Sequence, residues 1–336
     1  MSHRQLLKST VKRGALIAAA NWPVTLVQAT ADSLFKLLLA VPMIGGLFLV
    51  ALVVGTDPNA LISLDWREMA ATIVSALLSH PVVLFTFLLA VAVVGIGGSF
   101  FVYLVKAGTV AVLVKSEREA DAIEHGVMHI DHIARASRFS VETFATAAGA
   151  LFARYAQLGM ILSVVYLLSA GAYFGLVMAS RSAGEGWSVT ALLTALFVCW
   201  ITIVNLLYLL TQIVIAAENC TVSAAARRVG VFLRHDRANL TRVFLVILAV
   251  VVGATGASSL AAGLLSLIAF VPFVGLAVLP LLLAAWVLRA LVFQYIGLTS
   301  IGAYLNLYRR FAADFAEGRI HDRLQQVPFP HGAPAP

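Results

Sequence analysis

The sequence is poor in charged residues and in cysteine. Asp, Glu, Lys and Arg together make up 12% of its 336 residues, and there are two cysteines. A soluble domain carries about a quarter charged residues, so this shortage argues against a soluble globular protein. Cys199 lies inside an apolar run and Cys220 lies just after one, which argues against a disulfide framework.

The motifs of common enzymes are also missing. The chain contains no GxSxG nucleophile elbow, no Walker-type phosphate loop and no CxxC pair. No Asp, Glu or His lies in the central part of an apolar run, although proton-coupled transporters usually place relay residues there. These absences favour a protein that is not an enzyme and count against proton-driven transport. They leave a channel or a facilitated transporter open.

What the chain has in abundance is apolar residues, which make up 61% of the total. A helix that spans a bilayer needs about 20 mostly apolar residues, and several runs meet this length. They are residues 34–55, 81–105, 157–179, 188–215, 243–269 and 272–293. We therefore predict an all-α polytopic membrane protein whose six transmembrane helices form one domain over residues 1–325. The Pro- and Gly-rich tail, 326–336, is predicted to be disordered.

Basic residues are concentrated in alternate segments between these runs. The N-terminal segment, the segments after the second and fourth runs and the C-terminal segment carry nearly all of the Lys and Arg, whereas the opposite segments hold only Arg67 and Arg181. The positive-inside rule then places both termini in the cytoplasm of a bacterial inner membrane. We expect the basic segments to attract anionic lipid headgroups, which explains the net charge of +7 without nucleic acid as a partner.

The basic segments before the first, third and fifth runs mix apolar and polar residues. Leu16 and Trp22 occur in the first of them, Phe144 and Leu151 in the second, and Phe232 in the third. Amphipathic helices of this kind lie in the headgroup plane, with Arg and Lys reaching lipid phosphate. We therefore predict interfacial helices on the cytosolic side.

Four polar residues within or beside the apolar runs are candidates for an intramembrane site. Asn205 and Gln212 are seven residues apart, so they share a face of the fourth helix, and Glu218 lies at its inner end. Arg289 needs an acceptor if it is buried, and Glu218 is the best candidate. Hydrogen bonds that hold helices together are the interpretation we favour, and a polar path for a substrate is the alternative.

A second cluster lies in the segment after the second run. Asp121, His125, His129 and His132 fall within one narrow arc of a helix, because their spacing is four, four and three residues. Histidines at this spacing with a carboxylate can bind a divalent metal, although Gly126 interrupts the helix. A solvated polar face is the favoured interpretation, and a metal or pH-sensing site is the alternative. No other cofactor is predicted.

Small residues form a stripe in the fifth run. The stripe consists of Gly253, Gly256, Ala257, Ser259 and Gly263. Small residues let helix backbones approach closely in membranes, so the stripe predicts a helix-packing face.

In the segment between the first two runs, Asp65-x-x-Glu68 fits a capping box, and His80-Pro81 is expected to end one helix and begin the next.

The last third of the chain carries a pattern of an acidic residue, a helix of small residues and arginines, and a tyrosine–arginine ending. It consists of Glu218-Asn-Cys-Thr-Val-Ser-Ala-Ala-Ala-Arg-Arg-Val-Gly-Val-Phe-Leu-Arg234 and Ala303-Tyr-Leu-Asn-Leu-Tyr-Arg-Arg310. This pattern resembles a group of bacterial six-span membrane proteins. The group includes the membrane domain of glycerophosphoryl diester phosphodiesterases and related families of unknown function. The resemblance implies a six-span domain but not the phosphodiesterase activity, because nothing here matches that catalytic domain.

Together these features predict a non-catalytic integral membrane protein that organises lipid or a partner complex from the cytosolic face. The partner can be a different protein or a second copy of the chain. The first alternative is a transporter or channel with a polar path through Asn205, Gln212, Glu218 and Arg289. The second is a membrane-embedded lipid enzyme that uses the cluster from Asp121 to His132.

Overall fold

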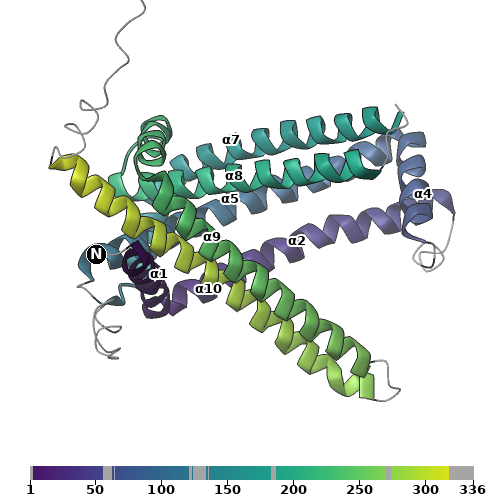
Figure 1. The fold of residues 1–336 in the computed structure, drawn as a ribbon. Coiled ribbons are helices and arrows are strands. Elements are labelled where there is room, and N and C mark those ends of the chain that lie inside the picture. Colours follow the sequence, from purple (N-terminus) through teal and green to yellow (C-terminus); the bar gives the residue numbers. More distant parts are fainter. Residues whose placement is uncertain are drawn as a thin grey trace, which may run out of the picture. The chain divides into compact units, whose positions relative to one another are not determined.

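The structure is a computed structural model that describes residues 3–55, 63, 65–120, 123, 134, 136–182, 187–269 and 274–317 (Figure 1). Within these ranges every regular element is an α-helix. The helices are α1 (His3–Ala20), α2 (Trp22–Val54), α4 (Trp66–Ser79), α5 (Pro81–Glu119), α7 (Val141–Ser182), α8 (Trp187–Glu218), α9 (Val222–Ala269) and α10 (Val274–Ala316). The predicted disordered tail, 326–336, lies outside the described residues.

Six of these helices are long and apolar enough to cross a membrane, which confirms the all-α, six-span prediction. They are Trp22–Val53, Pro81–Glu119, Val141–Ser180, Trp187–Glu218, Val222–Leu267 and Pro280–Ala316. Several are longer than a bilayer requires: the 42 residues of α7 extend roughly 63 Å, against about 30 Å of hydrocarbon. The extra length lies at the basic ends of the helices.

The basic segments that were predicted to form interfacial helices take three different forms. The first is the separate helix α1, which a turn at Asn21 divides from α2. The second is the start of α7 and continues into the span without a break. In α9, non-helical backbone at Asp236 (φ −117°, ψ 27°) separates residues 222–235 from 237–269. Placement of these segments at a membrane surface stays a prediction.

Contacts divide the chain into two compact units, Met1–Leu26 with Ala107–Pro336, and Val27–Lys106. In the second unit, α4 ends at Ser79 and α5 begins at Pro81, as the His80-Pro81 pair predicted. Asp65 stands at the N-cap of α4 but makes no side-chain capping hydrogen bond, so the predicted capping box is not formed. A small apolar core joins α2 to α4, and it consists of Val50, Ala51, Ala76 and Leu77.

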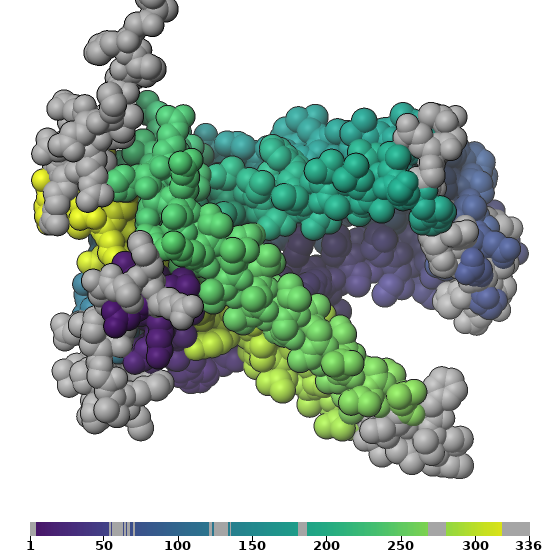
Figure 2. Space-filling model, viewed as in Figure 1, coloured from purple at the N-terminus to yellow at the C-terminus, as the bar shows by residue number. Residues whose placement is uncertain are grey.

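In the first unit, α7 pairs with α8 and α9 pairs with α10, while α1 packs on α10 (Figure 1). The largest fully buried side chains of this unit come from the parts of α1, α5, α7, α8, α9 and α10 nearest the basic segments. They include Ile17, Leu113, Tyr155, Phe232 and Tyr304. By contrast, only 0% to 17% of the most hydropathic stretch of each span is buried. In the space-filling view, the face of α9 that is turned toward the viewer is uncovered (Figure 2).

Candidate functional site

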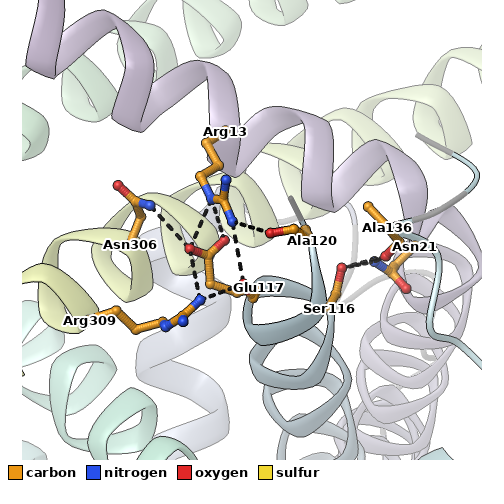
Figure 3. Close-up of polar contacts among 8 residues, drawn as sticks. All are labelled: Arg13, Asn21, Ser116, Glu117, Ala120, Ala136, Asn306 and Arg309. Carbon is orange, nitrogen blue, oxygen red and sulfur yellow. Dashed lines mark hydrogen bonds and ion pairs between the residues drawn. The ribbon is translucent and has the colours of Figure 1, made fainter. Parts of the chain in front are cut away.

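Glu117, in the last turn of α5, is the centre of a buried polar cluster in the first unit (Figure 3). The side chain is 1% exposed. Arg13 of α1 donates from Nε to both carboxylate oxygens, at 2.9 and 2.8 Å. From α10, Asn306 Nδ2 donates to Oε1 at 3.1 Å, and Arg309 Nη1 lies 3.6 Å from the same oxygen. We call these four residues the Glu117 cluster.

The two arginines of the Glu117 cluster also cap the end of α5. Arg13 Nη2 donates to the carbonyl oxygens of Glu117 and Ala120, at 3.3 and 3.0 Å, and Arg309 donates to the Glu117 carbonyl. The last carbonyls of a helix have no partner within the helix and carry partial negative charge. Cationic donors at this point therefore stabilise both the helix end and the buried carboxylate. Arg309 is 42% exposed, so the net positive charge of the cluster reaches the surface there.

Asn21 ties the turn between α1 and α2 to the same region. Its side chain is fully buried, and Nδ2 lies 3.0 Å from both the Ile17 carbonyl oxygen and Ser116 Oγ. Its Oδ1 accepts from the backbone N–H of Arg138 at 2.9 Å, and Ser116 Oγ donates to the Ala136 carbonyl (Figure 3). One amide thus joins α1, α5 and the segment before α7.

Close contact between two glycines brings α1 against α10. A Cβ at Gly14 would lie 2.5 Å from the Thr299 carbonyl oxygen and 2.6 Å from the Ala303 nitrogen. A Cβ at Gly302 would lie 2.9 Å from the Cα of Gly14. Backbone meets backbone here, so neither position has room for a side chain. This approach places Arg13 where it can reach Glu117.

A second cluster forms at the other basic helix ends of the first unit. Tyr308 of α10 donates its hydroxyl to Glu218 Oε1, and Arg228 of α9 pairs with Glu218 Oε2 at 3.0 Å. We call these three residues the Glu218 cluster. All three belong to the sequence pattern of the last third of the chain, and the fold brings them together from three helices.

The turn between α8 and α9 is held by two further arginines. Asn219 adopts a left-handed backbone conformation (φ 51°), which asparagine tolerates better than other residues with a Cβ. Arg154 donates to Asn219 Oδ1, and Arg118 donates to the Ala217 carbonyl at the end of α8. In the same turn, burial and the nearby Glu218 raise the pKa of the Cys220 thiol, so this cysteine stays protonated and is a poor nucleophile.

Two hollows adjoin these clusters. A cavity of about 170 Å³ is lined by Arg118, Arg309, Glu218 and Tyr308, among others. A more open pocket of about 290 Å³ is lined by two arginines and three apolar side chains, namely Arg227, Arg228, Val231, Phe311 and Phe315. Arg228 lines this pocket and also pairs with Glu218. Arg227 is exposed and has no partner among the described residues. Guanidinium groups beside aromatic rings suit an anion attached to an apolar body.

The residues proposed for a polar intramembrane path lie in different surroundings. Asn205 is exposed and accepts from the Tyr166 hydroxyl, an α7–α8 bond of the kind that holds helices together. Gln212 is buried, its carbonyl accepts from Tyr155 at 2.9 Å, and its Nε2 has no partner among the described residues. The face of α8 that Asn205 and Gln212 share is therefore exposed at Asn205 and buried at Gln212, two turns further along the helix.

Arg289 does not reach Glu218. Glu218 contacts Tyr308, and Arg289 precedes Tyr308 on α10 by roughly 28 Å at about 1.5 Å per residue. The guanidinium of Arg289 lies 5.7 Å from the ring centre of Phe293 instead. The structure therefore joins Glu218 to Tyr308 and Arg228, and it leaves Arg289 in a separate place on α10.

The predicted metal site at Asp121, His125, His129 and His132 lies outside the described residues and stays a prediction. Among the residues that are described, no group of three or more His, Cys, Asp or Glu side chains is placed to hold a metal ion. Comparison of the chain with models of known protein families, with curated proteins and with solved structures finds no match. Its function therefore has to be argued from its own geometry.

Proposed function

We propose that this chain is a non-catalytic integral membrane protein that organises anionic lipid at the basic ends of its helices. The observation that carries the proposal is the open pocket of about 290 Å³ in which Arg227 and Arg228 adjoin Phe311 and Phe315. A lipid phosphate fits the arginines, and the glycerol and first methylenes fit the aromatic wall. The proposal includes the placement of both termini in the cytoplasm of a bacterial inner membrane, which the one-sided basic residues support.

The different contacts of the arginines support this proposal. Arg13, Arg118 and Arg309 donate to helix-end carbonyls, so they serve the fold. Arg227 donates to no helix-end carbonyl among the described residues, and it lies exposed beside the apolar side chains of the pocket. Each Lys or Arg near an anionic membrane surface contributes about 1 kcal/mol of attraction. Exposed arginines of this kind are sufficient to enrich anionic lipid around the protein.

The test is the lipid that leaves the membrane with the protein. The full chain is reconstituted into vesicles of phosphatidylcholine and phosphatidylglycerol and extracted with a styrene–maleic acid polymer, and the lipid ratio of the particles is compared with that of the vesicles. We expect phosphatidylglycerol to be enriched, and Arg227→Gln to lower the enrichment by about fivefold at low salt.

Arg237→Gln is the matched control, because Arg237 is exposed on the same helix and does not line the pocket. Arg237 lacks the aromatic wall of the pocket, so its substitution is expected to lower the enrichment clearly less than Arg227→Gln does. Particles with the same lipid ratio as the vesicles, or equal losses in the two variants, would contradict the proposal.

A further inference from the structure

A groove of about 460 Å³ runs between α9 and α10 in the first unit. On the α9 side its wall consists of small residues, including Ala257, Ser258 and Ala261. On the α10 side it consists of larger residues, including Leu282 and Trp286. The volume lies within the range of about 300–1,000 Å³ that is typical of ligand pockets.

The small-residue stripe of α9 was predicted to be a helix-packing face. A Cβ added at Gly253, Gly256 or Gly263 would meet no atom of the described residues within 4 Å, so these three glycines do not pack against another described helix of this chain. Ala257, the next member of the stripe, lines the groove. Small side chains on this helix therefore leave a hollow beside α10.

Arg289 is the charged residue among those that line the groove. It is exposed, and its contact within the described part of the chain is the Phe293 ring at 5.7 Å. The sequence contains no Asp or Glu between Asp236 and Asp314, so this helix pair offers it no carboxylate. A guanidinium without an anion is costly at membrane depth, and the anion has to come from outside the pair.

With Val274 at one boundary of the hydrocarbon layer, Arg289 stands within reach of the phosphate level of the opposite leaflet. It lies roughly 22 Å from Val274 at about 1.5 Å per residue, and the hydrocarbon layer is about 30 Å thick. The flexible stem of an arginine reaches the remaining distance to the headgroups on the basic side. From Arg289 to Leu282, on the apolar side of the guanidinium, the groove follows α10 for roughly 10 Å, which holds the upper part of an acyl chain.

We infer that the groove holds one acyl chain of an anionic phospholipid whose phosphate pairs with Arg289. The apolar walls take the chain, and the guanidinium supplies the charge that the phosphate requires. This is a discrete site for a single lipid. Its last residue on α10, Phe293, lies roughly 27 Å along the helix from Phe311 of the other pocket, and the site does not depend on the enrichment proposed for Arg227.

Native mass spectrometry of the purified full chain tests this site. The protein is titrated with phosphatidylglycerol and phosphatidylcholine in a mild detergent, and the lipids retained per chain are counted. We expect one retained phosphatidylglycerol, with a preference over phosphatidylcholine that falls about fivefold in Arg289→Gln. Ala261→Phe fills the groove and is expected to abolish retention of both lipids.

Two controls separate this site from its surroundings. Ala249→Phe places the same bulk on an exposed part of α9 away from the groove and should leave retention intact. Arg227→Gln should lower the bulk enrichment of anionic lipid without changing the retained lipid. A melting temperature close to that of the wild type shows that each variant is folded.

Two results would overturn the inference. One is an unchanged lipid preference in Arg289→Gln. The other is a change in the mass of the protein assembly, rather than in its lipid count, when Ala261 becomes Phe. The latter would make the groove an interface between copies of the chain.

Discussion

The basic helix ends and the apolar spans of the first unit are built on opposite principles. At the basic ends, aromatic and aliphatic side chains such as Tyr155 and Leu113 are fully buried around paired charges. Along the spans, side chains such as Leu167 (74% exposed) and Leu260 (72%) have no protein cover. The part of the chain that looks most polar in the sequence is therefore the best packed, and the most apolar part is left for lipid.

This difference follows from what each region has as its surroundings. A lipid tail is as apolar as leucine, so burying a span side chain against protein gains little in a membrane. Beyond the hydrocarbon the hydrophobic effect operates, and the ends of long helices gain by packing together. We therefore expect substitutions at the basic ends to destabilise the protein much more than substitutions along the spans.

The largest effect is expected at Glu117. Glu117→Gln removes the carboxylate that faces Arg13 and leaves a buried guanidinium without its charge partner. Breaking a buried pair from one side costs about 3–5 kcal/mol, measured as the free energy of unfolding in mixed micelles. The control is Glu119→Gln, because Glu119 is 44% exposed in its pair with Arg138 and should contribute about 1 kcal/mol or less. Equal losses would show that burial does not govern the Glu117 cluster.

The second comparison uses the same substitution in the two regions. Leu113→Ala empties a fully buried position and is expected to lower the free energy of unfolding by about 2–5 kcal/mol. Leu167→Ala removes the same atoms from a side chain that is 74% exposed. It should change the free energy of unfolding by about 0.5 kcal/mol or less. A large loss from Leu167→Ala would reveal a protein partner on the span surface.

The smallest effect is expected where α1 meets α10. Gly14→Ala places a Cβ 2.5 Å from the Thr299 carbonyl oxygen, and we expect a loss of about 1–3 kcal/mol in unfolding free energy. Gly297→Ala is the control, because a Cβ there meets no atom within 4 Å. It should be neutral or stabilise α10 by up to about 1 kcal/mol. Equal behaviour of the two variants would mean that α1 is not held closely against α10.

The Glu117 cluster could not have been predicted from the sequence. Glu117 occurs in the run Lys115-Ser-Glu-Arg-Glu119, which has the composition of a solvated helix end. Its partners Arg13 and Asn306 lie about 100 and 190 residues away in the chain. The local signal of a close helix approach was the row of small residues Thr10, Gly14 and Ala18, spaced four apart on α1. It predicts a packing face but does not name the partner helix.

The sequence by itself determined the class of the protein. Runs of about 20 apolar residues have a single stable solution in lipid, a helix whose backbone groups all bond within the segment. Hence the six spans and the His80-Pro81 break between α4 and α5 followed from local pattern alone. Only the tertiary structure decided which charged side chains hold helix ends together and which stay exposed on the surface. Arg13 and Arg227 look alike in the sequence, and what separates them is whether a helix end from elsewhere in the chain, here that of α5, lies within hydrogen-bond reach.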